Sequence, residues 1–568
     1  MKKWALLLVV LSCQLYSLAQ SPFGNYFQDT LKPGHRISGT LDSVDVNLAA
    51  YQHTLPGDFN PFLFRFSYSD LNTTWQKLLP RRYSTIPHIA FEYSMGSKLA
   101  QFGRITYTQA LDSNTFLQFD YIRNTTNGNL RNSNFERNSV QLALMHRSRY
   151  YGTVLDVSFY TNHNQLNNGL IGDTVREGFA LDFQEVGKSN AGNKTKELHA
   201  DWKNYISFTK DSLQKVGVLL QSRLDIKNQR YFERDTVKEI YGFYNYDTVN
   251  TYDYWELSSL RLNGGLFYKN RGINFEAGLG ARYWDYDNLI IHQDTTEAYG
   301  FAALDMIVKG FLLKATANYT FVGATGETAI TADLRKRIKA NIFSFHGDFS
   351  RQYPDNYQRT YYGNTINYAW TDKQLSTRTT GRLNWTNKNR IIPFFAEAFV
   401  ESNTKMPVFV KSRWRQDTLT QLSVVGIQLG FEYSYKKLLI QSRASYREST
   451  GDLLPNLLIS GRIAYNGGLF KAKKLKTVTG IEVGYISSYQ LLDFTPMMNT
   501  YSFANSGRTF NNMMKLHFFS QFDLGYFRWF IRIENIEQTF VSPMNYEGLG
   551  YPVTPLQFRF GVSWDFFN

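Results

Sequence analysis

A strict alternation of apolar and polar residues is the feature that most constrains the fold of this chain. In the last segment, the apolar positions are Phe558, Phe560, Val562, Trp564 and Phe566. The positions between them are polar or small, from Arg559 to Asp565. The same pattern recurs over residues 117–121, 273–280, 313–321, 514–523 and 527–534. Because successive side chains of a strand point to opposite faces, each segment is predicted to be a strand with one apolar and one polar face.

A soluble β-sandwich would show the same alternation, so the length of the strands decides between the two folds. The alternating segments run for about ten residues, which is enough to cross a bilayer at a tilt, whereas strands average about five or six residues in soluble proteins. No segment approaches 18 consecutive apolar residues, so no transmembrane helix is predicted. A sheet in lipid must close on itself because unpaired backbone groups are costly there. The predicted fold is all-β, a transmembrane antiparallel up-and-down barrel.

The composition agrees with such a barrel. Aromatic residues make up 16% of the chain and charged residues only 19%, yet the mean hydropathy is −0.37. Apolar outer faces averaged with polar inner faces account for these values. Aromatic residues near strand ends are expected to form girdles at the membrane interfaces. Those predicted to do so are Tyr107, Trp284, Trp385 and Trp564.

The N-terminus has the layout of a secretory signal peptide. Lys2 and Lys3 precede the apolar run 4–11, and Ser17 and Ala19 supply small residues for cleavage. Residues 1–19 are therefore predicted to be a signal peptide, and the sole cysteine, Cys13, leaves with it. Residues 20–60 are polar and are expected to form a periplasmic segment or a small plug. Residues 61–568 are assigned to the barrel, which places the protein in the outer membrane of a bacterial cell.

Short and long connections alternate along the barrel region, as in bacterial barrels with short periplasmic turns and long outer loops. Lysine-bearing short turns are predicted at Lys309-Gly310, Lys336-Arg337 and Lys436-Lys437. The aromatic segment 241–255 is predicted to lie in an outer loop, where it packs over the pore mouth or stacks on sugars. The strand number is expected to be even, about 22 within a range of 16–22, beginning near residue 86.

The search for catalytic chemistry finds no motif. There is no H-E-x-x-H or G-x-S-x-G sequence, and the nine histidines are scattered. His517 is interpreted as a lumen residue. No catalytic residue, metal site or cofactor is predicted. Two alternatives to a pore stay open: a lipase-like hydrolase embedded in the barrel, since spacing does not reveal a triad, and a structural or secretion component of the outer membrane.

The formal net charge of +14 falls to +12 without Lys2 and Lys3. An exported chain has little access to nucleic acid, so the expected partners are outer-membrane lipids, the barrel-assembly machinery and small hydrophilic solutes, anionic ones among them. Basic residues on predicted polar faces are candidates for the lumen: Arg443, Arg462, Lys515, Arg528, Arg532 and Arg559. They form either a wall cross-paired with acids or a basic ladder that favours anions.

The C-terminal part resembles the putative porins of the Bacteroidetes outer membrane. The resemblance rests on the closing strand 556–566, with its Arg-x-Gly-x-x-Trp-x-Phe pattern, on the Tyr- and Pro-rich stretch 546–555, and on the preceding strand 527–535. It is firmest over about the last 120 residues. It implies a pore for small solutes and no cofactor. One departure is Asn568, which follows the aromatic residue on which such barrels usually end.

Overall fold

The computed structural model describes residues 29–30, 82–84, 86–173, 175, 180–209, 214–234, 243–370, 373–388, 392–410, 413–416, 421–470, 474–502, 507–540 and 545–567. The predicted signal peptide lies outside these residues. So does the predicted N-terminal segment 20–60, except for β1 (Asp29–Thr30), which pairs in parallel with β2 (Arg82–Tyr83). Among the described residues, no helix is long and apolar enough to cross a membrane.

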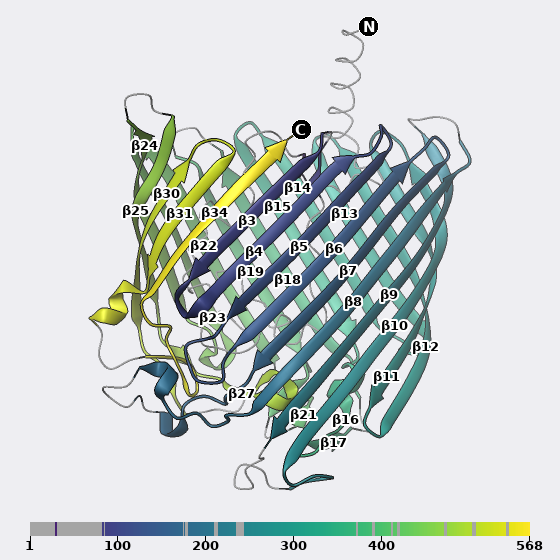
Figure 1. Ribbon diagram of the computed structural model, residues 1–568. Coiled ribbons are helices and arrows are strands. Elements are labelled where there is room, and N and C mark those ends of the chain that lie inside the picture. The colour runs from purple at the N-terminus through teal and green to yellow at the C-terminus, as the bar shows by residue number, and fades with distance from the viewer. Residues whose placement is uncertain are drawn as a thin grey trace.

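Twenty-two strands form a closed barrel (Figure 1), as the alternation predicted. The strands are β3 (His88–Gly96), β4 (Ala100–Ala110), β5 (Thr115–Thr126), β6 (Phe135–Arg147), β7 (Tyr151–Gln165), β8 (Ala191–Ser207), β9 (Lys215–Arg234), β10 (Asn250–Lys269), β11 (Ile273–Asn288), β12 (Ile291–Val308), β13 (Phe311–Val322), β14 (Thr328–Ile338), β15 (Asn341–Gln352), β18 (Ser376–Asn387), β19 (Phe394–Thr404), β22 (Gln421–Tyr435), β23 (Leu438–Ser449), β24 (Leu457–Leu469), β25 (Leu475–Ile486), β30 (Met513–Asp523), β31 (Phe527–Glu534) and β34 (Gln557–Phe567).

Each barrel strand pairs antiparallel with the barrel strands that precede and follow it, which is the up-and-down topology. The first and last strands close the barrel: β3 pairs with β34 from His88 opposite Phe567 to Gly96 opposite Arg559. We call this pairing the seam. The predicted fold class, the even strand number and the count of 22 are confirmed.

The connections at the two ends of the barrel differ in length. Short turns such as Lys309-Gly310 and Lys436-Lys437 lie at the end where the chain terminates, and the long segments lie at the other. Short turns mark the periplasmic end of such barrels. The predicted turn at Lys336-Arg337 is wrong by about three residues: both residues belong to β14, and the chain reverses at Lys339, whose φ is +52°.

The strands are longer on one side of the barrel than a span of about ten residues requires. Strands β7 to β12 have 15 to 20 residues, whereas β31 has eight. In Figure 1 the longest strands continue below the others on the side of the long connections. One consequence is a correction. Residues 250–255 of the aromatic segment 241–255, predicted to be loop, are the start of β10.

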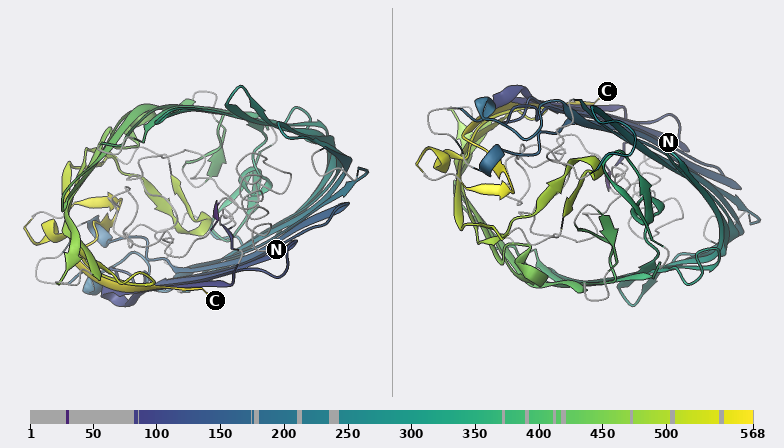
Figure 2. Two further views of the ribbon diagram at one scale, coloured as in Figure 1. Left: turned by 90° about the horizontal axis from the view of Figure 1, so that it is seen from above. Right: turned by 90° about the horizontal axis from the view of Figure 1, so that it is seen from below.

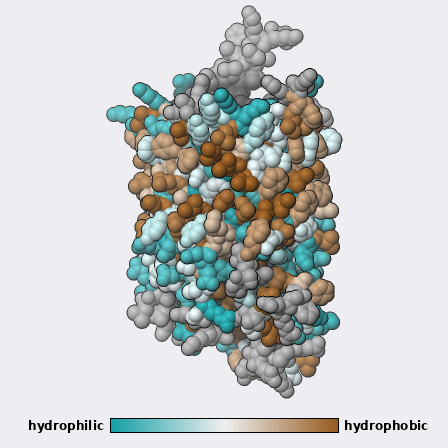
Figure 3. All heavy atoms as spheres, turned by 90° about the vertical axis from the view of Figure 1, so that its left-hand side faces the viewer, coloured by the Kyte–Doolittle hydropathy of each residue, from teal (hydrophilic) through white to brown (hydrophobic). Residues whose placement is uncertain are grey.

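On the face of the barrel shown in Figure 3, apolar side chains form a broad band, with hydrophilic ones below it. In the closing strand, the outward side chains of Phe558, Phe560, Trp564 and Phe566 are 39 to 47% exposed, and Val562 is half-buried on the same face. Tyr107, Trp385 and Trp564 lie on outward faces. The prediction for Trp284 is wrong, because this residue shares the inward face of β11 with the buried Tyr286.

Small elements from the long connections lie inside the barrel outline when it is viewed along its axis (Figure 2). They are α2 (Asn356–Arg359), β16 (Thr360–Tyr362), β17 (Asn367–Ala369), β20 (Val408–Val410), β21 (Arg413–Arg415), β27 (Asp493–Thr495) and β28 (Thr500–Ser502). Four of them form one sheet in the order β21-β20-β28-β27. Further short pairs are β26 (Tyr489–Gln490) with β29 (Thr509–Phe510), and β32 (Tyr546–Gly548) with β33 (Tyr551–Pro552).

Candidate functional site

The lumen of the barrel is the candidate site, because the polar faces of all the strands point into it. The six predicted basic residues lie on inward faces and are each no more than 6% exposed: Arg443, Arg462, Lys515, Arg528, Arg532 and Arg559. They lie on β23, β24, β30, β31 and β34. Strands β23 to β25, β30, β31 and β34 follow one another around the barrel, so these residues form one wall.

Most of the positive charge on this wall faces a carboxylate. Glu482 on β25 accepts hydrogen bonds from Arg462, with Nε 2.9 Å from Oε1, and from Arg532. Arg532 also pairs with Glu534 at 2.9 Å, and Glu534 pairs with Arg559 at 3.2 Å. These five residues form a continuous chain of alternating charge, which we call the C-terminal network. All five are buried.

Further contacts complete the same wall. Arg528 donates to Asp565 at 2.7 Å, and the other carboxylate oxygen of Asp565 lies 3.3 Å from His88 across the seam. Lys515 lies 3.6 Å from Glu547, and Arg443 donates to Gln428 at 2.8 Å. The structure thus arranges the predicted basic residues as a cross-paired wall, which is one of the two interpretations that the sequence left open. Much of the positive charge on this wall is therefore offset by carboxylates of the barrel itself.

A second charged group, on the opposite wall, was missed by sequence reasoning. Arg223, Arg261 and Arg282 are directly opposite one another on β9, β10 and β11. Arg223 donates to Asp225 at 2.9 Å, and Arg282 donates to Glu297 and, at 2.8 Å, to Glu327. We call the three arginines the arginine row. The alternation in the sequence shows that all three side chains point inward. That they lie side by side depends on the register between the strands, which the sequence does not show.

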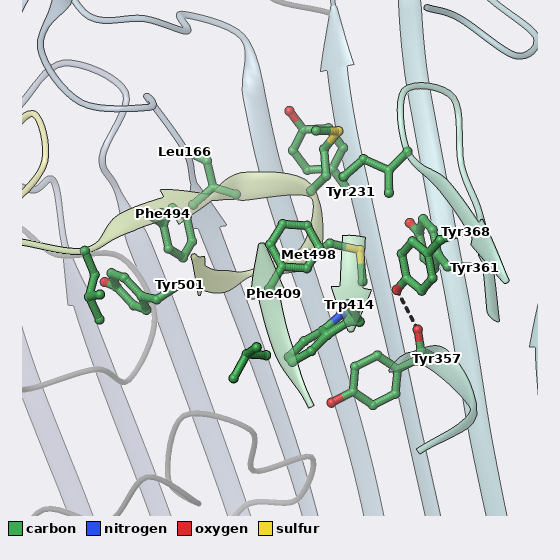
Figure 4. Close-up of a cluster of buried hydrophobic side chains, with 14 of the residues drawn as sticks. Leu166, Tyr231, Tyr357, Tyr361, Tyr368, Phe409, Trp414, Phe494, Met498 and Tyr501 are labelled. Atoms are coloured by element: carbon green, nitrogen blue, oxygen red, sulfur yellow. Dashed lines mark hydrogen bonds between the residues drawn. The ribbon is translucent and has the colours of Figure 1, made fainter. Parts of the chain in front are cut away.

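A cluster of buried apolar side chains, which we call the cap, lies on the side of the long connections (Figure 4). It consists of side chains from the inward-folded connections, packed against one another and against the barrel wall. Trp255 on β10 stacks on Tyr357 of α2, with ring centroids 4.6 Å apart and planes at 5°. Trp414 meets the edges of Tyr357 and Phe409 at 6.2 and 5.6 Å. Trp255 is buried and therefore packs within the cap, which is one of the two alternatives that the sequence left open for the segment 241–255.

Hydrogen bonds fix the connections that carry the cap. The Tyr368 hydroxyl donates to the Tyr357 carbonyl at 2.7 Å, and the Trp370 indole donates to the Trp414 carbonyl at 2.6 Å. On the side facing the lumen, burial raises the pKa of the Asp355 carboxyl to about 6, and the nearby Glu327 carboxylate adds to the rise. The cap therefore has a carboxyl group that titrates near neutral pH at its edge.

A cavity of about 670 Å³ lies beside the cap, between the connection that carries α2 and the barrel wall. Arg261, Arg282 and Trp284 line it from the wall, and Arg359 and Lys373 line it from the connection that carries α2. Its volume is within the range of about 300–1,000 Å³ that is usual for small-molecule sites. The cavity is therefore large enough for a sugar-sized solute.

Several of the described histidines contact groups of neighbouring barrel segments. Among the described residues, no group of three or more His, Cys, Asp or Glu side chains could hold a metal ion. His199 contacts Asp225, and Ser259 lies opposite Asp225 on the next strand. His199 and Ser259 are thus two strands apart, about 10 Å. His517 is buried and accepts a hydrogen bond from the Asn535 backbone amide at 2.9 Å.

The model of one protein family matches most of the chain: the family described as "Putative porin" matches residues 50–568. Among curated proteins, no relative matches this sequence. The fold is similar to solved structures of metal transporters and a ferric preacinetobactin receptor at low sequence identity. The FrpB iron transporter from Neisseria meningitidis is 10% identical, with a TM-score of 0.57, over 85% of this chain and 81% of that one.

Two further structures give the same result. The copper transporter OprC is 9% identical, with a TM-score of 0.60, over 86% of this chain and 82% of that one. BauA, the ferric preacinetobactin receptor from Acinetobacter baumannii, is 8% identical, with a TM-score of 0.55, over 85% of this chain and 80% of that one. At these identities the likeness extends to the fold alone.

Proposed function

Because the chain belongs to the family of "Putative porin" proteins, we propose that its barrel lets small hydrophilic solutes diffuse across the outer membrane through a water-filled, mildly basic lumen. The observation that carries this proposal is the closed ring of 22 strands whose inward faces are polar. Barrels of 16–18 strands already leave an aqueous channel, and the diameter grows with strand number. A barrel of this size encloses water unless its interior is filled.

The inward-folded connections set the size limit of the pathway. They occupy part of the outer half of the lumen, and the cavity of about 670 Å³ beside the cap is the space left along the wall of β10 to β12. We expect monosaccharides to pass and oligosaccharides to be retarded. The cross-paired C-terminal network would then act as a polar lining, and Arg261, the one arginine of the row for which the described residues supply no ion pair, would add basic character.

Solute flux into liposomes tests the proposal. The purified chain is reconstituted, and swelling rates are measured in isotonic arabinose, glucose, sucrose and raffinose. We expect uptake that falls with solute size. If liposomes that contain the protein take up arabinose no faster than empty liposomes, a diffusion pore is refuted. A salt-gradient measurement in planar bilayers gives the charge preference, for which we expect a reversal potential on the anion-selective side.

The alternatives have tests of their own. We propose that the barrel is not a lipase-like hydrolase, because His199 contacts Asp225 and its Nε2 atom has no hydrogen-bond partner, serine included, among the described residues. Ester hydrolysis by the purified barrel would overturn this proposal. A structural or secretion role predicts co-purifying envelope proteins. In our proposal, residues 1–19 direct export, and the outward face of the closing strand is what outer-membrane lipids and the assembly machinery contact.

A further inference from the structure

The arginine row places three like charges side by side inside the lumen. Arg261 is directly opposite Arg223 on one side and Arg282 on the other. Asp201 on β8 and Glu297 on β12 are opposite the two ends of the row. Adjacent strands are about 4.8 Å apart, so the three guanidinium groups repel one another unless negative charge offsets them.

The two outer arginines have carboxylates and the central one does not. Arg223 pairs with Asp225, and Arg282 pairs with Glu297 and Glu327. Among the residues that the structure describes, no carboxylate lies within ion-pair distance of Arg261. Its Nε atom is buried without a hydrogen-bond partner there, and its guanidinium lies 5.9 Å from the ring centre of Trp284. Buried guanidinium groups are normally satisfied by hydrogen bonds or anions.

The same guanidinium is accessible from a cavity. Arg261 lines the space of about 670 Å³, together with Arg282 on the wall and with Arg359 and Lys373 from the α2 connection. The Nε atom of Arg359 is also buried with no partner among the described residues. Five cationic side chains line this cavity, the fifth being Arg378 of β18, and the carboxylates of Asp294, Glu297, Glu327 and Asp355 line it as well. Within the described residues, three of the five, Arg261, Arg359 and Arg378, have a buried Nε atom without a hydrogen-bond partner.

The remaining lining determines what else a solute must carry. Thr295, Gln358 and Asn403 supply hydroxyl and amide groups to the same cavity. Such groups bind hydroxyls, and an arginine fork binds a carboxylate or a phosphate through two oxygens. A ligand that satisfies both has an oxyanion and several hydroxyls within the size of a monosaccharide.

We propose that this cavity is a binding subsite for small sugar acids or sugar phosphates, with Arg261 as the residue that binds the oxyanion. The inference rests on the proposed pore function, since it gives the lumen a preferred solute. Arg359 and Lys373 approach the same group from the cap side, and the amide and hydroxyl side chains contact the sugar hydroxyls. The subsite lies on the path along the wall of β10 to β12, so a solute that crosses there meets it.

Equilibrium binding tests the subsite without requiring conduction. The purified full chain in detergent is titrated calorimetrically with glucose, glucuronate and glucose 6-phosphate at constant ionic strength. The three probes share a ring and differ in the anion, so comparing them distinguishes a carboxylate from a phosphate. The variant is Arg261→Gln. The matched control is Arg382→Gln, which removes an inward-facing arginine of β18 that does not line the cavity.

We expect at least one anionic probe to bind tenfold or more tightly than glucose, R261Q to lose tenfold or more of that affinity, and R382Q to stay within twofold of the wild type. A charged hydrogen bond of this kind accounts for such a factor. If R261Q does not fold, Lys373→Gln on the connection serves instead, with an expected loss of threefold or more.

Equal binding of glucose and both anions, no binding of any probe at 50 mM, or equal losses in R261Q and R382Q would overturn the subsite. The proposed pore is judged separately by arabinose and glucose flux in liposomes. A barrel that conducts sugars but binds no anion refutes the subsite alone, and one that binds anions but conducts nothing refutes the pore alone.

Discussion

Glu482 is the centre of the C-terminal network, so its removal gives the sharpest test of how the lumen wall is held. Its side chain is fully buried, and its two carboxylate oxygens accept from Arg462 and Arg532. Glu482→Gln keeps the shape but replaces one acceptor with an amide donor facing a guanidinium. Arg532 retains the carboxylate of Glu534, whereas Arg462 retains the amide oxygen of Gln441 at 3.3 Å.

The expected loss in the free energy of unfolding comes from removing the carboxylate that Glu482 supplies to the buried Arg462. Breaking a buried ion pair by removing one partner costs about 3–5 kcal/mol. The retained Glu534 places E482Q near the lower end of this range, about 3 kcal/mol. Replacing Arg462 by Met as well removes the stranded charge, and we expect E482Q/R462M to recover more than half of the loss.

Unfolding in guanidinium, followed by tryptophan fluorescence of the detergent-solubilised barrel, measures the effect. Glu448→Gln is the control, because Glu448 lies on the outward face of β23, exposed, with only a hydrogen bond from Tyr446. We expect this control to change the free energy of unfolding by less than about 0.5 kcal/mol. If E482Q unfolds at the same denaturant concentration as E448Q, the C-terminal network does not stabilise the barrel as argued.

Three further predictions follow from the cap, its edge and the outer surface. Trp255→Ala removes the ring stacked on Tyr357, so we expect the cap to loosen at a cost of about 3–5 kcal/mol and raffinose uptake into liposomes to rise relative to Trp255→Phe. The raised pKa of Asp355 means that the folded state binds its proton more tightly than the unfolded state, so the stabilisation from the protonated carboxyl is lost as pH rises through about 6. Amide exchange of residues 356–359 should then be faster at pH 7.5 than at pH 5 after correction for the intrinsic rate, and Asp355→Asn should abolish the difference. Phe560→Lys places a charge on the outward face of the closing strand, and we expect a loss of about 2–4 kcal/mol near the bilayer midplane, measured as folded yield in lipid vesicles against the inward-face control Ser563→Lys.

The alternation predicted the barrel because it is a local property, present in every strand by itself. The same rule, applied further, would have placed Trp284 correctly. The apolar positions of β11 from Ile273 to Leu279 are odd-numbered, so an even-numbered residue of that strand faces the lumen. The error came from giving the preference of tryptophan for membrane interfaces more weight than strand parity.

Other parts of the site depend on distances between segments that a sequence does not contain. Arg462 meets Glu482 because β24 and β25 pair in one register, and a shift of two residues would separate them. The turn placed at Lys336 instead of Lys339 shows how easily such a shift arises. The cap is less predictable still, since Tyr357, Phe409 and Trp414 lie in segments with no strand periodicity and meet only after the barrel has brought their connections together.

The seam between β3 and β34 has a consequence for biosynthesis. Every other barrel pairing joins consecutive barrel strands and can form as a hairpin, but His88 and Asp565 are 477 residues apart. The entropy of closing so long a loop is only about 5 kcal/mol, because it grows with the logarithm of length. The order of synthesis is a greater obstacle than this entropy. Strand β3 can pair with β4 early, but its other edge stays unpaired until β34, the strand made last, becomes available. Until then the sheet has two open edges, and a chain that stops before β34 keeps both of them available to its neighbours.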